Sequence, residues 1–240
     1  MFNFFNNPYK RYYSNLIHET RKDKLNQFRY NKKYSNQDSK LLSLYGECDS
    51  FKKKIKLLII ADTHGGLKEL DLKNILFQHP EYDACILLGD YSQQDLTIIL
   101  KYISPNKIYA LLGNHDGNYI KEYNLRNLNG NIYRVNDVSF LGIEGSFRYK
   151  NEKFPSFTQK ESIEFLNDKP KVDILFSHDA PFELSGINDI AHQGLFGINY
   201  YLYKNKVPIC IHGHVHIPYD KQLSNGTHIH CSYMLEYVEL

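Results

Sequence analysis

Nine side chains of the kinds that ligate metal ions occur in five short motifs, and each motif follows an apolar run. The motifs are Asp62-Thr63-His64, Gly89-Asp90, Gly113-Asn114-His115-Asp116, Ser177-His178 and Gly213-His214-Val215-His216. Carboxylate, imidazole and amide oxygen suit divalent Mn, Fe, Zn or Co, and the motifs contain no thiolate. The residue types therefore predict a site for transition-metal ions.

The apolar runs cover residues 55–60, 84–88, 108–112, 172–176 and 208–211. Each has the length of a buried parallel strand. In an open α/β sheet, the segments that follow such strands meet at the carboxyl ends of the strands. We therefore expect all five motifs to converge on one site.

Two ions in such a site suit chemistry at phosphorus. Ions about 3.5–4 Å apart can hold the attacking and leaving oxygens of an in-line displacement, and this spacing requires a shared carboxylate. Asp62 and His64 are two residues apart, so on an extended segment both point the same way and can address one ion. A neutral Asn ligand leaves the pair of dications partly unneutralised and attractive to a phosphate.

The ordered set D-x-H, G-D, G-N-H-D, H and G-H-x-H resembles the calcineurin-like metallophosphoesterase superfamily, in a compact prokaryotic or phage-type form, over about residues 55 to 233. The resemblance implies a four-layer α/β sandwich, with two mixed sheets flanked by helices. It also implies that Asp90 bridges two ions, with Mn as the first candidate and Fe, Zn, Ni, Co and Mg as alternatives. Asp62, His64 and His216 would complete one site, and Asn114, His178 and His214 the other. Gln93 departs from the G-D-x-x-[DR] pattern of many phosphoprotein phosphatases, which argues against that subgroup.

The resemblance gives His115 a catalytic role. A water between two metals would be deprotonated near neutral pH and attack phosphorus, and the departing alkoxide would need a proton. An imidazole titrates in the right range, so His115 is the candidate general acid, with a turn-capping histidine as the alternative. Asp116 would orient His115 or keep it protonated, unless it is an ordinary turn aspartate. Arg148 and Asn114 are candidates for binding the substrate phosphate, with a solvated loop arginine as the alternative for Arg148.

Four other histidines and Asp189 have two alternative roles each or share a strand face. Asp189 and His192 either line the pocket or lie on a surface loop. His212 either supports a ligand through a hydrogen bond or is purely structural. His228 and His230 alternate in a late strand, which predicts that they share one ordinary face.

The remaining elements follow from periodicity and turn signals. Helices are expected over 67–77, 94–103, 159–166 and 195–204, the third with a capping box from Thr158 to Glu161. Asn136-Asp137 predicts a hairpin between strands at 132–135 and 138–143, and Asn225-Gly226 predicts a second.

Charge separates an N-terminal extension, 1–54, from the domain at 55–240. The extension holds 12 Lys or Arg against 5 Asp or Glu, whereas the remainder holds 17 against 22. Basic residues among aromatics can bind nucleic acid. The alternative is a solvated extension, with a helix near residues 9–30 packed on the domain or on a second subunit as an oligomer contact.

Composition indicates a cytoplasmic protein with no membrane segment. No apolar run approaches the 18 or so residues that cross a bilayer, and the start of the chain does not read as a secretory signal. The four cysteines form no C-x-x-C pair.

The sequence therefore predicts a binuclear metal-dependent phosphoesterase that hydrolyses a phosphomonoester or phosphodiester. A nuclease or cyclic-nucleotide phosphodiesterase is an alternative within the same chemistry. A non-catalytic metal-binding scaffold is an alternative of another class, against which the presence of His115 argues.

Overall fold

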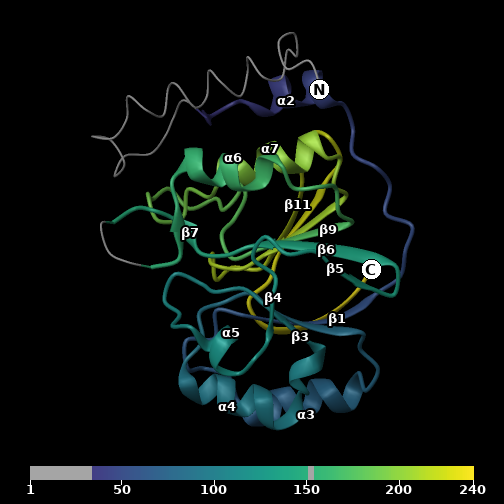
Figure 1. Ribbon diagram of the computed structural model, residues 1–240, viewed down its shortest axis with the longest axis vertical. Helices are drawn as coiled ribbons and strands as arrows, with labels where there is room; N and C mark the ends of the chain where they lie inside the picture. Colours follow the sequence, from purple (N-terminus) through teal and green to yellow (C-terminus); the bar gives the residue numbers. More distant parts are fainter. Residues whose placement is uncertain (1–33, 151–153) are drawn as a thin grey trace.

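The computed structural model describes residues 34–150 and 154–240, in which two β-sheets pack face to face between two sets of helices (Figure 1). This arrangement confirms the four-layer α/β sandwich with two mixed sheets that the sequence predicts. No helix among the described residues has both the length and the apolar character needed to cross a membrane.

The first sheet has the strand order β13-β1-β2-β3-β4. Its strands are β13 (Met234–Glu239), β1 (Lys56–Ala61), β2 (Ala84–Leu87), β3 (Ile108–Ala110) and β4 (Arg126–Asn127). Strands β1 to β4 pair in parallel, and only β13 is antiparallel, against β1. Three of the five strands expected to precede a motif lie side by side here.

The second sheet has the order β11-β12-β10-β9-β6-β5, and a small ribbon, β7-β8, lies apart from it. Its strands are β11 (Tyr219–Gln222), β12 (His228–Cys231), β10 (Ile209–His212), β9 (Ile174–Ser177), β6 (Val138–Ile143) and β5 (Tyr133–Val135); the ribbon strands are β7 (Ser146–Phe147) and β8 (Ser156–Phe157). The other two motif strands, β9 and β10, are parallel neighbours in this sheet. The five motif strands are thus divided between two sheets.

Burial on both faces explains why the motif strands are continuously apolar. In β1, Leu57 and Ile59 belong to the core between the sheets, while Leu58 and Ile60 face the helices of the outer layer. In β9, Phe176 faces the other sheet and Leu175 faces the opposite helical layer. A strand with two buried faces has no polar side, so it reads as an apolar run.

Helices cover both outer faces. Helices α3 (Glu69–Gln78), α4 (Gln93–Tyr102) and α5 (Tyr119–Glu122) supply residues to the core under the first sheet, and α2 (Asp38–Tyr45), α6 (Gln159–Asn167) and α7 (Phe196–Lys204) to the core over the second. A short 3-10 helix, η2 (Pro105–Lys107), leads into β3. Figure 1 shows the first group below the sheets and the second group above them.

The predicted helices and hairpins are present, with small differences at their ends. The capping box of α6 forms as expected, since Thr158 accepts from the Glu161 amide and Glu161 accepts from the Thr158 amide. In the β5-β6 hairpin both turn residues, Asn136 and Asp137, have left-handed backbone, as tight hairpin turns require. Helix α3 begins at Glu69, two residues later than expected, because Lys68 has extended backbone with φ −89° and ψ 128°.

The end of the N-terminal extension packs on the domain. Tyr34 and Leu41 are almost fully buried in the core formed with α6 and α7, and the ring of Tyr45 contacts that of Tyr200 edge to face. The helix expected near residues 9–30 lies outside the described residues, and nucleic-acid binding by the extension stays a prediction.

Candidate metal centre

The ligand-type side chains project from loops whose backbone is tightly bent. Asp62, His64, Asp90, His214 and His216 all have left-handed backbone, with φ between 45° and 67°. Such conformations are uncommon outside glycine and cost about 1–3 kcal/mol each. Strain of this kind concentrates at functional sites.

The loops bring the predicted ligands into two adjacent groups. One contains Asp62, His64 and His216, and the other Asp90, His178 and His214, with the ligand atoms of each group within 4.8 Å of one another. Asn114 joins the second group, since its Oδ1 lies 3.0 Å from Nε2 of His178. The five motifs therefore converge as the sequence predicts.

Asp90 belongs to the second group and also approaches the first. Its Oδ2 is 3.7 Å from Nε2 of His64 in one group and 3.7 Å from Nε2 of His178 in the other. The second oxygen, Oδ1, accepts a hydrogen bond from the amide of His115 at 2.8 Å. One carboxylate oxygen thus faces ligands from both halves of the site.

The donor set fits divalent metal ions. Oδ1 of Asp62 is buried and has no hydrogen-bond partner, although it lies 3.7 Å from Nε2 of His216 and 3.9 Å from Nδ1 of His178. A buried carboxylate oxygen without a donor is costly unless something else compensates its charge. A cation held among these nitrogen and oxygen atoms would supply that compensation.

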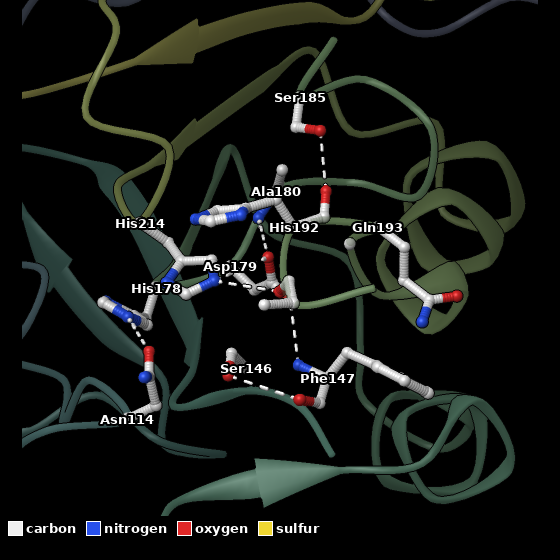
Figure 2. Close-up of polar contacts among 12 residues, drawn as sticks. Asn114, Ser146, Phe147, His178, Asp179, Ala180, Ser185, His192, Gln193 and His214 are labelled. Carbon is white, nitrogen blue, oxygen red and sulfur yellow. Dashed lines mark hydrogen bonds and ion pairs between the residues drawn. The ribbon is translucent and has the colours of Figure 1, made fainter. Parts of the chain in front are cut away.

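Hydrogen bonds fix which nitrogen each buried histidine presents. Nδ1 of His178 lies 2.8 Å from the Leu88 carbonyl, so Nδ1 carries a proton and Nε2, 3.0 Å from Oδ1 of Asn114, is the nitrogen available to a metal. Nε2 of His214 lies 3.1 Å from the Ala191 carbonyl, which leaves Nδ1 for a metal. Histidine ligands in proteins are oriented in this way by a carbonyl or carboxylate behind the ring. Figure 2 shows the His178 ring beside Asn114 and the His214 ring directed toward Asp179.

Burial and charge set the protonation of these rings. Burial, reinforced by the charge of His178, lowers the pKa of His214 well below its ordinary value, so this ring is neutral as a ligand must be. Burial also lowers the pKa of His178, but the Asp90 and Asp62 carboxylates outweigh it and raise that pKa overall. The two carboxylates therefore attract positive charge to the centre of the site.

The site is closed on one side and open on the other. Asp62, Asp90, Asn114, His178 and His214 are buried, whereas His64, His115 and His216 are exposed. A ligand would therefore approach from the side of the three exposed rings.

This geometry agrees with a comparison of the sequence with protein families. The model of the calcineurin-like phosphoesterases matches residues 55–218. The chain belongs to the calcineurin-like phosphoesterase family. This family is metal-dependent, so the chain is a metal-dependent phosphoester hydrolase.

Solved structures share the fold of this phosphoesterase at low sequence identity. The protein TT1561 of Thermus thermophilus is 15% identical with a TM-score of 0.50, over 77% of this chain and 98% of that one. Phosphopantetheinyl hydrolase from Mycobacterium tuberculosis is 12% identical with a TM-score of 0.51, over 76% and 95% of the two chains. Comparison with curated proteins finds no significant match.

His115 lies at the open side of the phosphoesterase site. Its ring is exposed and contacts that of His64 edge to face, with centroids 5.7 Å apart. The ring therefore adjoins a predicted ligand and belongs to neither ligand group. The role of His115 as a proton donor stays a prediction.

Asp116 holds the backbone of the site. Its Oδ2 accepts from the amides of Asp90 and Gly113 at 2.7 and 2.6 Å, and its Oδ1 accepts from the amide of Tyr91 at 2.8 Å. These contacts match the turn aspartate that the sequence allows, because both oxygens bind amides of the two metal-site loops. An orienting role toward His115 stays a prediction.

The guanidinium of Arg148 binds within its own neighbourhood. It donates to the carbonyl and hydroxyl of Ser156 and forms an ion pair with Glu161 at 3.0 Å. The arginine thereby links the β7-β8 ribbon to the first turn of α6. Substrate binding by Arg148 stays a prediction, and it requires this guanidinium to exchange partners.

Two aspartates that the sequence did not indicate as site residues support the loops of the site. Asp95 caps α4 and also accepts from the amides of Gly65 and Leu67, which fixes the loop after His64. Asp179 accepts from the amides of Phe147 and Ala180 (Figure 2), and burial raises its pKa to about 6. The capping spacing of Ser92 and Asp95 was a usable signal for the first, but nothing in the sequence indicated the second.

His192 lies beside the predicted ligand His214. Its ring packs against that of His214 with centroids 4.9 Å apart, and its Nδ1 binds Asp189 at 2.8 Å. The pocket-lining alternative therefore describes His192 better than a remote surface loop. His212, in contrast, is buried and bonds to the Gly213 carbonyl and the Tyr219 hydroxyl, so it supports the loop that carries His214.

Proposed function

We propose that this chain is a binuclear metallophosphoesterase that hydrolyses phosphomonoesters or phosphodiesters. Asp62, His64 and His216 would hold one divalent ion, Asn114, His178 and His214 the other, and Asp90 both. Two such ions, most simply of Mn, would polarise the phosphoryl group and activate a water molecule.

The position of Asp90 carries this proposal. A site for a single ion needs no oxygen shared between two groups of ligands. Oδ2 of Asp90, however, lies 3.7 Å from a nitrogen of each group. Distances of this size are compatible with a cation on each side of one oxygen. The uncompensated Oδ1 of Asp62 supports the same interpretation.

The residues of the chain have separate roles in the proposed reaction. The carboxylates and imidazoles would hold the ions, and the neutral Asn114 would leave positive charge that attracts an anionic phosphate. His115, on the exposed side, gives a proton to the departing oxygen of the ester. A proton at this point matters most where the leaving group is a poor one.

The test is hydrolysis of bis(4-nitrophenyl) phosphate and 4-nitrophenyl phosphate by the full chain with added Mn²⁺. We expect Mn-dependent turnover and two equivalents of bound metal. Asp90→Asn should lower both the metal content and kcat/KM, whereas Asp71→Asn on the exposed face of α3 should change neither.

The outcomes separate the alternatives. Two bound ions without hydrolysis of either ester, or of cyclic nucleotides or single-stranded DNA, would favour the non-catalytic scaffold. A single bound ion in the active protein would contradict the binuclear proposal. Turnover confined to the diester substrates would place the protein with the nucleases or cyclic-nucleotide phosphodiesterases.

A further inference from the structure

A second group of ligand-type side chains lies away from the phosphoesterase site, on strands β11 and β12. Asp220, His228 and His230 each offer a ligand atom, and these atoms lie within 4.8 Å of one another. The antiparallel register places Asp220 directly opposite His230, and His228 is two residues before His230. All three side chains therefore share one face of the sheet, as the sequence predicted for the two histidines.

The distances within this group suit a small cation. Oδ1 of Asp220 lies 2.9 Å from Nε2 of His228 and 2.9 Å from Nδ1 of His230. Zinc bonds of about 2.0–2.1 Å in a tetrahedron hold ligand atoms about 3.3 Å apart. Movements of a few tenths of an ångström would therefore open the group to an ion, and the half-exposed His228 and Asp220 have room for them.

A fourth residue orients the more buried histidine. Oε1 of Glu236, on β13 of the other sheet, lies 2.7 Å from Nε2 of His230. With the Nε2 proton donated to Glu236, loss of the Nδ1 proton leaves a lone pair that can bind an ion beside Asp220. A carboxylate behind a histidine is the arrangement that orients metal-binding imidazoles and increases their basicity.

We propose that Asp220, His228 and His230 bind a divalent transition-metal ion, zinc foremost, at a site separate from the phosphoesterase centre. Two imidazoles and a carboxylate are a ligand set that zinc accepts, with the fourth position left to water. The charges of Asp220 and Glu236 neutralise a dication when both rings are neutral. A bound ion would join β11 to β12, and through Glu236 it would tie the second sheet to the edge strand of the first.

The surroundings leave this site accessible. The side chains of Asp220 and His228 are 62% and 47% exposed. His228 also lines a cavity of about 510 Å³ between residues 47–51 and the turn at Asn225 and Gly226. An ion can therefore reach the group from solvent without any change in the fold.

Protons compete with the metal for the same atoms. Burial lowers the pKa of His230, but its bonds to Glu236 and Asp220 outweigh this and raise it to about 9. Without metal, the group is a set of ion pairs, and an ion must displace the proton at Nδ1. The alternative to the proposal is that the group serves only as this ion-pair network.

The experiment measures zinc bound by the full chain after removal of all metal with a chelator, by titration calorimetry and by metal content after gel filtration. His228→Gln and Asp220→Asn should each bind one equivalent fewer than the wild type, with Mn-dependent hydrolysis unchanged. Glu236→Gln should keep the site but weaken it by about 10–100-fold. His79→Gln, whose ring stacks on Tyr237 outside the group, is the matched control and should bind as the wild type does.

The proposal is overturned if His228→Gln and Asp220→Asn bind as many equivalents as the wild type with the same affinity. Because both side chains are half exposed, these variants should fold, and circular dichroism will verify it. The count of equivalents is read without any substrate, so failure of this proposal and failure of the proposed hydrolysis are distinguishable.

Discussion

A Cβ atom on Gly113 would lie 2.0 Å from Oδ1 of Asp90. The same atom would lie 2.7 Å from the Asp90 amide, so any larger residue at position 113 must displace the carboxylate at the centre of the site. We therefore expect Gly113→Ala to lower metal affinity and kcat/KM together, by about 10-fold or more, since a displacement of this size disrupts a preorganised site. Metal content and steady-state hydrolysis with Mn²⁺ measure the effect.

Gly117→Ala is the matched control, since a Cβ at Gly117, in the same loop, meets nothing within 4 Å. It should retain the metal content and activity of the wild type. Equal behaviour of the two alanine variants would show that the close approach at position 113 does not govern the site.

Asp116→Asn tests whether the backbone contacts of this aspartate support the metal centre. An amide keeps one acceptor oxygen, so some of the bonds to the amides of Asp90, Tyr91 and Gly113 are lost. We expect metal affinity to fall by about 10–100-fold, as it does when residues behind metal ligands are changed. Saturating Mn²⁺ should restore most of the activity. If activity is lost while affinity is unchanged, Asp116 acts on His115 instead.

His115→Ala should affect substrates according to their leaving group. The exposed ring adjoins His64 but belongs to neither ligand group, so its removal should leave two equivalents of metal bound. We expect kcat to fall by about 10²–10⁴-fold with phenyl phosphate and much less with 4-nitrophenyl phosphate, whose leaving group departs without a proton. An equal loss with both substrates would exclude the general-acid role.

The sequence predicts most of this fold because apolar strands and turn residues are recognised from local sequence alone. A strand buried on both faces must be apolar throughout, so the runs before Asp62, Asp90 and His178 identify the strands. The turn chemistry of Asn136 and Asp137 likewise identifies a hairpin. The order of the motifs then predicts the family without any knowledge of the packing.

Relationships between distant segments could not be predicted in this way. Asp179 supports the site through the amide of Phe147, 32 residues earlier. His192 comes beside His214 by the path of a loop without a regular pattern. These contacts depend on tertiary packing, whereas residue types and spacing report on local structure.

Asp173→Asn should destabilise the protein in a pH-dependent manner. Burial raises the pKa of Asp173, but bonds from Lys53 at 2.7 Å and from the hydroxyl and amide of Ser139 outweigh it and hold the pKa below its ordinary value. A carboxylate with a lowered pKa stabilises the fold above the pKa it has in the unfolded chain, and that contribution disappears as the pH falls through the lower, folded value. We therefore expect the variant to lose about 1–3 kcal/mol of unfolding free energy at pH 7, and the difference from the wild type to vanish on acidification below about pH 4.

Urea unfolding across this pH range measures the difference in unfolding free energy, with the exposed Asp137→Asn of the neighbouring turn as a control that should show no such dependence. A difference between Asp173→Asn and the wild type that stays constant from pH 7 to pH 3 would show that the loss comes from packing and not from the charge.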